Sequence, residues 1–290
     1  MNKKIITLIF LFPIFNFVIA GEIFKSENHS FSIETVVDGL EYPWSMEFTS
    51  DGKILITERP GRLRIFENDE LSAPVKGLPE IKAEGQGGLL DIALDADFIN
   101  NKILFFSYSA GNLLGIGTEV SSAKLVNDEL KELKLLFKAL PKSRGGRHFG
   151  SRLLLTNDNS LYITLGDRGE MKRAQNINDH AGSLIRINKD GEIPKDNPFI
   201  KRSDAKAEIY TYGNRNIQGI ALNPVTYDIW TVEHGPQGGD ELNLMKPGIN
   251  YGWPVITYGV NYGTGTQIGE GAHKDGMAQP SHHWVPSIAT

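Results

Sequence analysis

The chain has 290 residues, of which 22% are charged and 40% hydrophobic, and its formal net charge is −5. These values are ordinary for a folded protein and leave room for one large domain with a sizeable core. The acidic balance argues against a nucleic-acid-binding function, since such proteins are usually basic. There is no cysteine, which excludes disulfides and thiolate metal sites. The 31 glycines and 14 prolines favour tight turns over long helices.

The first 20 residues have the pattern of a signal peptide. Lys3 and Lys4 form a short positive region, and residues 5–19 form an apolar stretch that ends before Ala20. This stretch is shorter than the ~20 residues needed to span a bilayer. We therefore predict a cleaved signal peptide over 1–20 and an exported domain over 21–290, periplasmic or secreted, with no membrane span after cleavage.

A strand–turn–strand unit recurs along the chain, in each case with alternating apolar residues around a polar turn. Further strand-like segments follow two of the copies, at 61–66 and 183–187. The copies recur at intervals near or above the ~40–50 residues of a β-propeller blade. The pattern predicts an all-β propeller. The four copies span 44–58, 89–107, 151–165 and 219–233.

Residues 127–139 are ambiguous between helix and strand. Their lysine and glutamate content suits a short helix, but Leu133, Leu135 and Phe137 alternate as in a strand. In a repeat protein of this kind we favour the strand.

The last residues, 284–290, lie where a fifth copy of the unit would begin. We therefore expect about four to four-and-a-half blades in this chain, and a chain that is incomplete at its C-terminus, because a propeller closes only when all its blades are present. A closed ring of four blades is the alternative.

Polar, glycine-bearing loops follow the second strand of three copies, at 58–61, 166–169 and 233–236. If the copies are equivalent blades, these loops lie on one rim of the ring. Loops on a rigid scaffold are where functional residues concentrate. We therefore expect the functional site on this rim.

His148 lies in a glycine-rich segment, 145–151, at the entry of the third copy. A histidine titrates near neutrality and suits proton abstraction. Asp167 follows on the loop after the partner strand, where its carboxylate could hold one imidazole tautomer. A purely structural histidine is the alternative.

Two further segments carry amide and guanidinium groups. Gln86 stands among glycines at 85–88, and Arg215 and Asn216 stand in a polar segment at 212–219. The planar fork of Arg215 suits carboxylates, and the amides suit ligand hydrogen bonds. Turn geometry explains the first segment equally well, and a hydrogen-bonded blade corner explains the second.

The segments 233–243 and 250–254 are rich in oxygen donors and turn formers. Carbonyls exposed by a Gly-Pro turn, with carboxylates nearby, suit a hard cation such as calcium. The spacing is not that of an EF-hand loop. A zinc site built from His148, His180 and His234 is not expected, because the three are far apart in the sequence.

Together and in this order, these motifs resemble the soluble aldose and glucose sugar dehydrogenases that depend on pyrroloquinoline quinone (PQQ), a family that includes glucose/sorbosone dehydrogenase-like proteins. The resemblance extends from about Thr35 to Ser287. It implies a six-bladed β-propeller with the cofactor in a cleft on one face. It also implies oxidation of an aldose at its anomeric carbon to a lactone, with an external electron acceptor. The most specific motifs are Arg215-Asn216-x-Gln218-Gly219, Glu233-x-Gly235-Pro236, Asp240-Glu241-x-Asn243 and Asn250-Tyr251-Gly252-Trp253-Pro254.

By this resemblance, His148 is the general base that takes the proton of the anomeric hydroxyl, and Asp167 is the carboxylate that supports it. Gln86 corresponds to a residue of the substrate and cofactor site. Arg215 and Asn216 correspond to residues that contact PQQ.

The resemblance also implies two calcium sites. Gly235 and Pro236 correspond to the residues whose carbonyls ligate the calcium bound to PQQ. Glu241 and Tyr251 correspond to ligands of a second, structural calcium.

The chain departs from the family pattern in two respects. Arg147 stands where the glucose enzyme has an acidic sugar contact, which indicates a broader or different aldose specificity. The lysines and arginines that hold the PQQ carboxylates lie in the family's C-terminal part and have no counterpart here. We therefore expect the 290-residue chain to be truncated, to bind PQQ weakly and to be inactive as it stands.

Two other functions remain as alternatives. One is a non-catalytic propeller that binds a carbohydrate or a protein on the same face. The other is a calcium-dependent lactonase, in which the metal activates water and His148 is not needed as a base. We expect a monomer or a homodimer in each case.

Overall fold

The computed structural model describes residues 22–289, so the predicted signal peptide at 1–20 lies outside the described residues. The chain divides into two units, up to Asp38 and from Gly39 onward. The described part of the first unit is an antiparallel hairpin of β1 (Ile23–Lys25) and β2 (Ser30–Ser32), in which the rings of Phe24 and Phe31 stack with their centres 5.8 Å apart.

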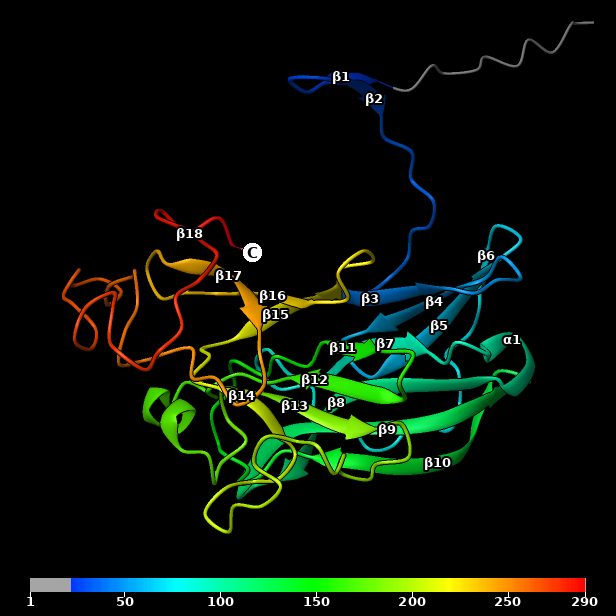
Figure 1. The fold of residues 1–290 in the computed structure, drawn as a ribbon. Helices are drawn as coiled ribbons and strands as arrows, with labels where there is room; N and C mark the ends of the chain where they lie inside the picture. Colours follow the sequence, from blue (N-terminus) through cyan, green and yellow to red (C-terminus); the bar gives the residue numbers. More distant parts are fainter. Residues whose placement is uncertain (1–21, 290) are drawn as a thin grey trace, which may run out of the picture. The chain divides into compact units, whose positions relative to one another are not determined.

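The described residues of the second unit form four sheets of four antiparallel strands, each taken in chain order (Figure 1). The first two sheets comprise β3 (Pro43–Phe48), β4 (Ile54–Glu58), β5 (Arg62–Glu67), β6 (Glu70–Leu71), and β7 (Leu89–Leu94), β8 (Ile103–Asn112), β9 (Gly115–Val126), β10 (Glu129–Lys138). The other two comprise β11 (Leu153–Leu155), β12 (Ser160–Thr164), β13 (Ser183–Asn188), β14 (Ile209–Tyr212), and β15 (Ile217–Leu222), β16 (Ile229–Glu233), β17 (Asp240–Met245), β18 (His282–Trp284). Short helical turns occur at α1 (Phe98–Asn101) and η1 (Met171–Gln175).

The sheets are successive blades of a propeller. The first strands of neighbouring sheets contact one another, β3 with β7, β7 with β11, and β11 with β15. This places the first strand of each blade nearest the axis, as propeller geometry requires. The prediction of an all-β propeller is therefore confirmed.

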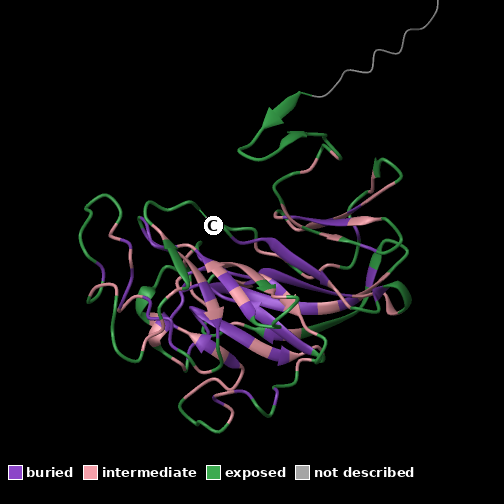
Figure 2. Ribbon diagram, turned by 45° about the horizontal axis from the view of Figure 1, so that its top comes forward, coloured by how far each residue is buried: buried purple, intermediate pink, exposed green. Residues whose placement is uncertain are grey.

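Apolar side chains fill the spaces between blades. Phe105 of the second blade packs in one cluster with Ile163 and Ile185 of the third. Leu184 of the third blade packs with Ile217 of the fourth. Because a middle blade is covered on both faces, its strands are apolar at consecutive positions rather than at alternate ones, and the buried residues concentrate along the strands in Figure 2.

The structure corrects the expectation for the last residues. The segment His282–Trp284 is β18, which pairs antiparallel with β17 and forms the outermost strand of the fourth blade. It is not the first strand of a fifth blade, so the described residues contain four blades, the lower end of the expected range. The strand expected within 127–139 is confirmed as β10.

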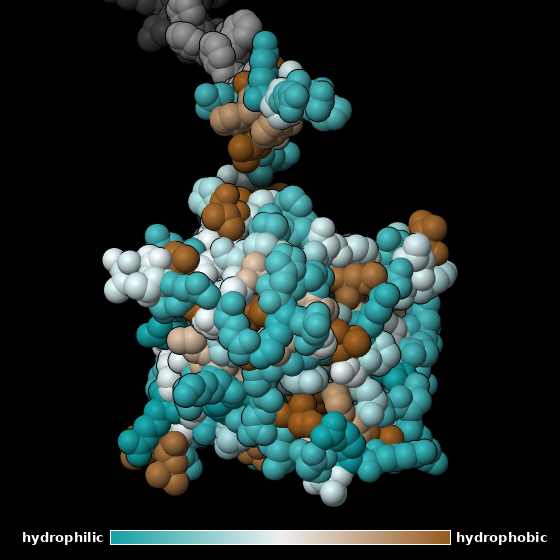
Figure 3. Space-filling model, turned by 60° about the vertical axis from the view of Figure 1, so that its left-hand side comes forward, coloured by the Kyte–Doolittle hydropathy of each residue, from teal (hydrophilic) through white to brown (hydrophobic). Residues whose placement is uncertain are grey.

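Figure 3 shows one face of the molecule. On the face shown in Figure 3, hydrophobic residues lie as separate groups among hydrophilic ones. Within the described range, none of the helices has the length and apolar character required to cross a bilayer.

Candidate functional site

A cavity of about 310 Å³ lies on the predicted rim, and all four blades contribute to its wall. Arg59 follows β4 and His234 follows β16, so loops after second strands meet here as expected. A larger cavity, of about 860 Å³, lies between η1 and the segment 254–270, but none of the predicted site residues lines it. The rim cavity is lined by Trp44, Arg59, Gln86, Leu90, Phe149, Gly150, Asn216, Gln218 and His234.

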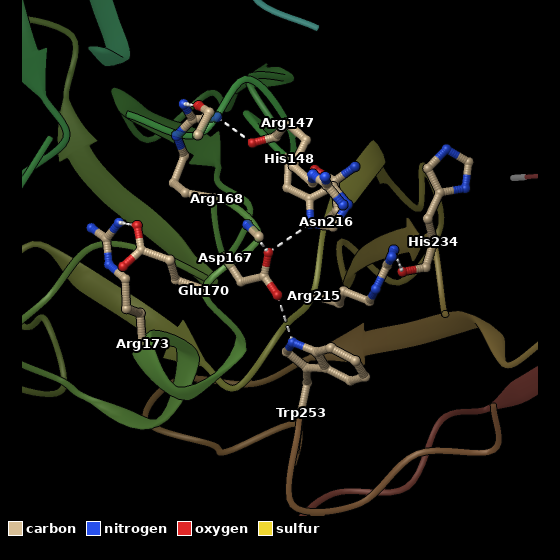
Figure 4. Close-up of polar contacts among 12 residues, drawn as sticks. Arg147, His148, Asp167, Arg168, Glu170, Arg173, Arg215, Asn216, His234 and Trp253 are labelled. Carbon is tan, nitrogen blue, oxygen red and sulfur yellow. Dashed lines mark hydrogen bonds and ion pairs between the residues drawn. The ribbon is translucent and has the colours of Figure 1, made fainter. Parts of the chain in front are cut away.

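His148 and Asp167 form a buried pair beside this cavity (Figure 4). The imidazole Nδ1 lies 2.6 Å from the carboxylate Oδ1. The side chain of His148 is 11% exposed and that of Asp167 is 1% exposed. His148 itself does not line the cavity, but Phe149 and Gly150, which follow it directly, do.

The environment of Asp167 fixes the direction of this hydrogen bond. Burial alone would raise the pKa of Asp167, but hydrogen bonds from His148, Gly169 and Trp253 outweigh burial and hold the pKa below its ordinary value. A carboxylate accepts but does not donate. The Nδ1 atom of His148 is therefore the donor in this contact, and in the neutral form of such an imidazole Nε2 has the lone pair that a general base needs.

Gln86 joins the His148 loop to the second blade. Its side-chain Oε1 accepts the main-chain N–H of His148 at 2.7 Å, and its own main-chain N–H donates to the carbonyl of Gly146 at 2.7 Å. The structure thus brings Gln86, His148 and Asp167 together.

Arg168 is a residue of the site that the sequence reasoning did not assign. Its guanidinium donates to the carbonyls of Gly145 and Arg147 and lies over the ring of Phe149, 3.5 Å from the centroid. Burial lowers the pKa of Arg168 to about 10, which still leaves the group charged at neutral pH. The only signal in the sequence was its place in the loop 166–169.

Arg215 and Asn216 stand directly before β15 of the fourth blade and contact the loops that carry His148 and Asp167. Asn216 Oδ1 accepts hydrogen bonds from the main-chain N–H of Gly150 and from Gln218 Nε2, both at 3.1 Å. Arg215 donates from Nη1 to the carbonyl of His234 at 3.1 Å. Its carbonyl accepts the main-chain N–H of Asp167 at 2.8 Å.

Trp253 completes the network, and sequence reasoning gave it no individual role. Its indole Nε1 donates to Asp167 Oδ2 at 2.8 Å, and the guanidinium of Arg215 lies 5.6 Å from its ring centroid. The only sequence signal was its membership of the segment 250–254.

The chemistry of this site fits PQQ, a planar quinone with carboxylates. Arg59 supplies a guanidinium in the cavity wall, and Gln86, Asn216 and Gln218 supply amides. Guanidinium groups pair with carboxylates, and amides bind carbonyl oxygens. The aromatic side chain of Trp44 adds a flat apolar surface to the same wall.

The turn after β16 fits a hard cation. Among residues 22–289, neither the carbonyl oxygen of Gly235 nor that of Pro236 accepts a hydrogen bond. A Cβ on Gly235 would lie 2.2 Å from the carbonyl oxygen of Gly239, so only glycine allows this close turn. Unpaired carbonyl oxygens are ligands that calcium prefers.

The surroundings of Glu241 also fit a cation. Burial and the neighbouring carboxylate of Glu233 raise the pKa of Glu241 to about 8. Asn243 donates from Nδ2 to both carboxylates, and its buried Oδ1 has no hydrogen-bond partner. The hydroxyl of Tyr251 contacts the main chain of Leu244 and Lys246, so a metal bond from Tyr251 would come from its carbonyl oxygen.

The histidines do not form a zinc site. Within the part of the chain that the structure describes, no group of three or more histidine, cysteine, aspartate or glutamate side chains could hold a metal ion. His180 instead accepts the main-chain N–H of Leu140 at Nδ1, and its Nε2 lies 2.9 Å from Glu208.

The fold and the site define a β-propeller with a histidine–aspartate pair beside a cavity lined by amides and guanidinium groups. Residues 40–290 match the family model of glucose/sorbosone dehydrogenase. The chain belongs to this family, which confirms the expected resemblance and places the protein among the sugar dehydrogenases, a class of oxidoreductases.

Individual relatives agree with this assignment. Aldose sugar dehydrogenase YliI of Escherichia coli is 42% identical over 265 residues, which are 89% of this chain and 71% of the relative. The crystal structure of the soluble aldose sugar dehydrogenase from Escherichia coli in the apo form superposes with a TM-score of 0.85 at 42% identity, covering 88% of this chain and 75% of that one. The PQQ-bound aldose sugar dehydrogenase from Streptomyces coelicolor superposes with a TM-score of 0.73 at 26% identity, covering 87% and 70%.

Proposed function

We propose that the protein oxidises aldose sugars at the anomeric carbon to lactones, with PQQ as cofactor and an external electron acceptor. The observation that carries this proposal is the buried pair of His148 and Asp167 beside the rim cavity, in which the imidazole Nδ1 lies 2.6 Å from the carboxylate Oδ1. The similarity to a PQQ-bound aldose sugar dehydrogenase supports the choice of cofactor.

In this proposal, Arg215, Asn216 and Gln86 hold PQQ, and the carbonyls of Gly235 and Pro236 ligate its calcium. Glu241 and Tyr251 hold a second calcium with a structural role. When bound, PQQ with its calcium supplies an electrophilic acceptor for the hydride of the anomeric carbon. The protein itself orients the sugar and the cofactor.

The chain itself supplies the proton transfer. Nε2 of His148 takes the proton of the anomeric hydroxyl while the hydride leaves the same carbon, so that the carbon loses two electrons and becomes the lactone carbonyl. The negative charge of Asp167 stabilises the imidazolium that forms. A positioned base of this kind contributes about 10²–10⁴-fold to the rate.

We propose that the enzyme is exported, to the periplasm or outside the cell. There it would meet free aldoses and an external electron acceptor.

Arg147 is exposed on the loop that carries His148, and we propose that it contributes to a sugar specificity different from that of the glucose enzyme.

The test is dye reduction by the purified 290-residue chain, supplied with PQQ, calcium and a panel of aldoses. PQQ-dependent turnover would support the proposal and would overturn the expectation that the 290-residue chain is inactive. The proposal expects His148→Ala to abolish this turnover while the circular dichroism spectrum and unfolding temperature stay unchanged. Turnover retained in His148→Ala would remove His148 as the base. The PQQ concentration dependence of the same assay tests the expectation that this chain binds the cofactor weakly.

The alternatives predict other results. A lactonase would hydrolyse lactones in calcium without PQQ. A binding propeller would retain sugars or proteins without turning them over. Either result, with no PQQ-dependent oxidation, would overturn the proposed function.

A further inference from the structure

Trp253 lies on the long segment between β17 and β18, yet its indole reaches the Asp167 loop of the preceding blade (Figure 4). Trp253 is 7% exposed, and its Nε1 donates to Asp167 Oδ2 at 2.8 Å. The proton transfer proposed above does not use this tryptophan.

The two oxygens of the Asp167 carboxylate have separate donors. Oδ1 accepts Nδ1–H of His148 at 2.6 Å and the main-chain N–H of Gly169 at 2.7 Å. Oδ2 accepts only the indole N–H of Trp253 within residues 22–289. A carboxylate held at one oxygen can still turn about its Cβ–Cγ bond, so Trp253 is the contact that fixes its plane.

Trp253 is itself fixed on several sides. Its main-chain N–H donates to the carbonyl of Gly213 at 2.8 Å, and its carbonyl accepts Gln175 Nε2 at 2.7 Å. Its ring lies beneath the guanidinium of Arg215. The indole of Trp253 is therefore held in place by residues of both blades. A side chain that orients another residue must itself be fixed in this way.

We propose that Trp253 is a positioning residue: its indole N–H holds Asp167 with Oδ1 facing His148 and thereby keeps the imidazole in the Nδ1–H tautomer. The kinetic consequence rests on the proposed function. The effect on the tautomer does not, because the pair is formed in the protein without cofactor.

The variant Trp253→Phe removes the donor and keeps an aromatic ring beneath Arg215. The matched control is Trp230→Phe in β16, outside the Asp167 network. The first measurement is ¹H–¹⁵N NMR of the histidine side chains in the cofactor-free protein. We expect the downfield Nδ1–H resonance of His148 to be lost in Trp253→Phe, with the Nε2–H tautomer populated, and to be retained in Trp230→Phe.

The second measurement is kcat and KM for an aldose with PQQ and calcium. Hydrogen-bond partners that orient metal-ligating histidines typically contribute about 10–100-fold, and by analogy we expect a kcat decrease of this size with KM changed less than about threefold. If the wild type shows no PQQ-dependent turnover but the tautomer shifts in Trp253→Phe, the positioning role stands and the proposed function fails.

A His148 resonance that is unchanged in Trp253→Phe overturns the proposal, whatever the activity. If Trp253→Phe does not fold, 3-benzothienylalanine at position 253 replaces the indole N–H with sulfur at nearly constant shape. The same NMR measurement on this variant then tests the proposal. A retained Nδ1–H resonance of His148 would contradict the proposal, and a lost resonance would support it.

Discussion

The guanidinium of Arg168 lies 3.5 Å from the ring centroid of Phe149 and donates to the carbonyls of Gly145 and Arg147. Three alternate residues of the His148 loop are thus held by one side chain from the loop that carries Asp167. Arg168 is 7% exposed, so these contacts are shielded from water.

We predict that Arg168→Ala lowers the free energy of unfolding by about 2–4 kcal/mol, because it removes a shielded cation–π contact and leaves two carbonyls without a donor. Denaturant unfolding followed by fluorescence measures this. Arg168→Lys keeps the charge but not the planar fork, so we expect it to recover less than half of the loss. Full recovery by lysine would show that charge alone matters.

Gly166 packs directly against the main chain of His148. A Cβ at this position would lie 2.3 Å from the carbonyl oxygen of His148 and 2.6 Å from Asn216 Oδ1. We predict that Gly166→Ala displaces the His148 loop, with a loss of about 1–3 kcal/mol, the usual cost of overpacking, and at least a tenfold loss of any His148-dependent turnover.

The matched control is Gly146→Ala in the loop that carries His148. A Cβ there would meet nothing closer than 3.5 Å, which is an ordinary contact. Unfolding temperatures of the two variants make the comparison. Equal behaviour of the two would contradict the steric account.

Asp167 predicts a specific dependence of stability on pH. Its pKa is below the ordinary value in the folded protein, so the unfolded chain takes up its proton first on acidification. The contribution of Asp167 is therefore complete above the unfolded value of about 4 and is lost as the pH falls through the folded value. Asp167→Asn should remove this part of the pH dependence.

Urea unfolding of wild type and Asp167→Asn between about pH 2 and pH 7 measures the effect. We expect the wild type to be more stable at neutral pH and the difference to shrink in acid. A difference that is constant across this range would argue against the charged state of Asp167.

Calcium should stabilise the fold if the sites after β16 and at Glu241 are occupied. A ligand at 100 times its Kd adds about 2.7 kcal/mol, and about 1 kcal/mol raises the unfolding temperature of a domain of this size by roughly 2–4 °C. We therefore expect calcium to raise the unfolding temperature by several degrees and a chelator to reverse it.

Glu241→Gln separates this effect from general ionic strength. The variant removes a carboxylate that could ionise to ligate the cation, so we expect it to be less sensitive to calcium than the wild type. Magnesium at equal concentration serves as the ion control. Mg²⁺ is smaller than Ca²⁺ and gives up its bound water reluctantly, so it binds poorly at sites built from protein carbonyls. An equal response to both ions would point to screening instead of a site.

Much of the architecture was predictable because it is local. The segments 54–58, 103–107 and 229–233 are apolar runs of strand length between turn-forming residues. This local pattern is typical of strands. The same holds for the loops after them, whose place on one rim follows from the repeat. The strand His282–Trp284 was misread because it is short and polar, and only its pairing with β17 makes it a strand.

The sequence by itself determined the blades, the family and the set of polar residues at the rim, since each depends on short-range patterns or on motifs in a fixed order. Only the tertiary structure decided which of these residues touch. The approach of Trp253 to Asp167, of Gln86 to His148 and of Arg168 to Phe149 joins residues from different loops. Such contacts depend on how blades pack against one another, and no periodicity along the chain records that packing.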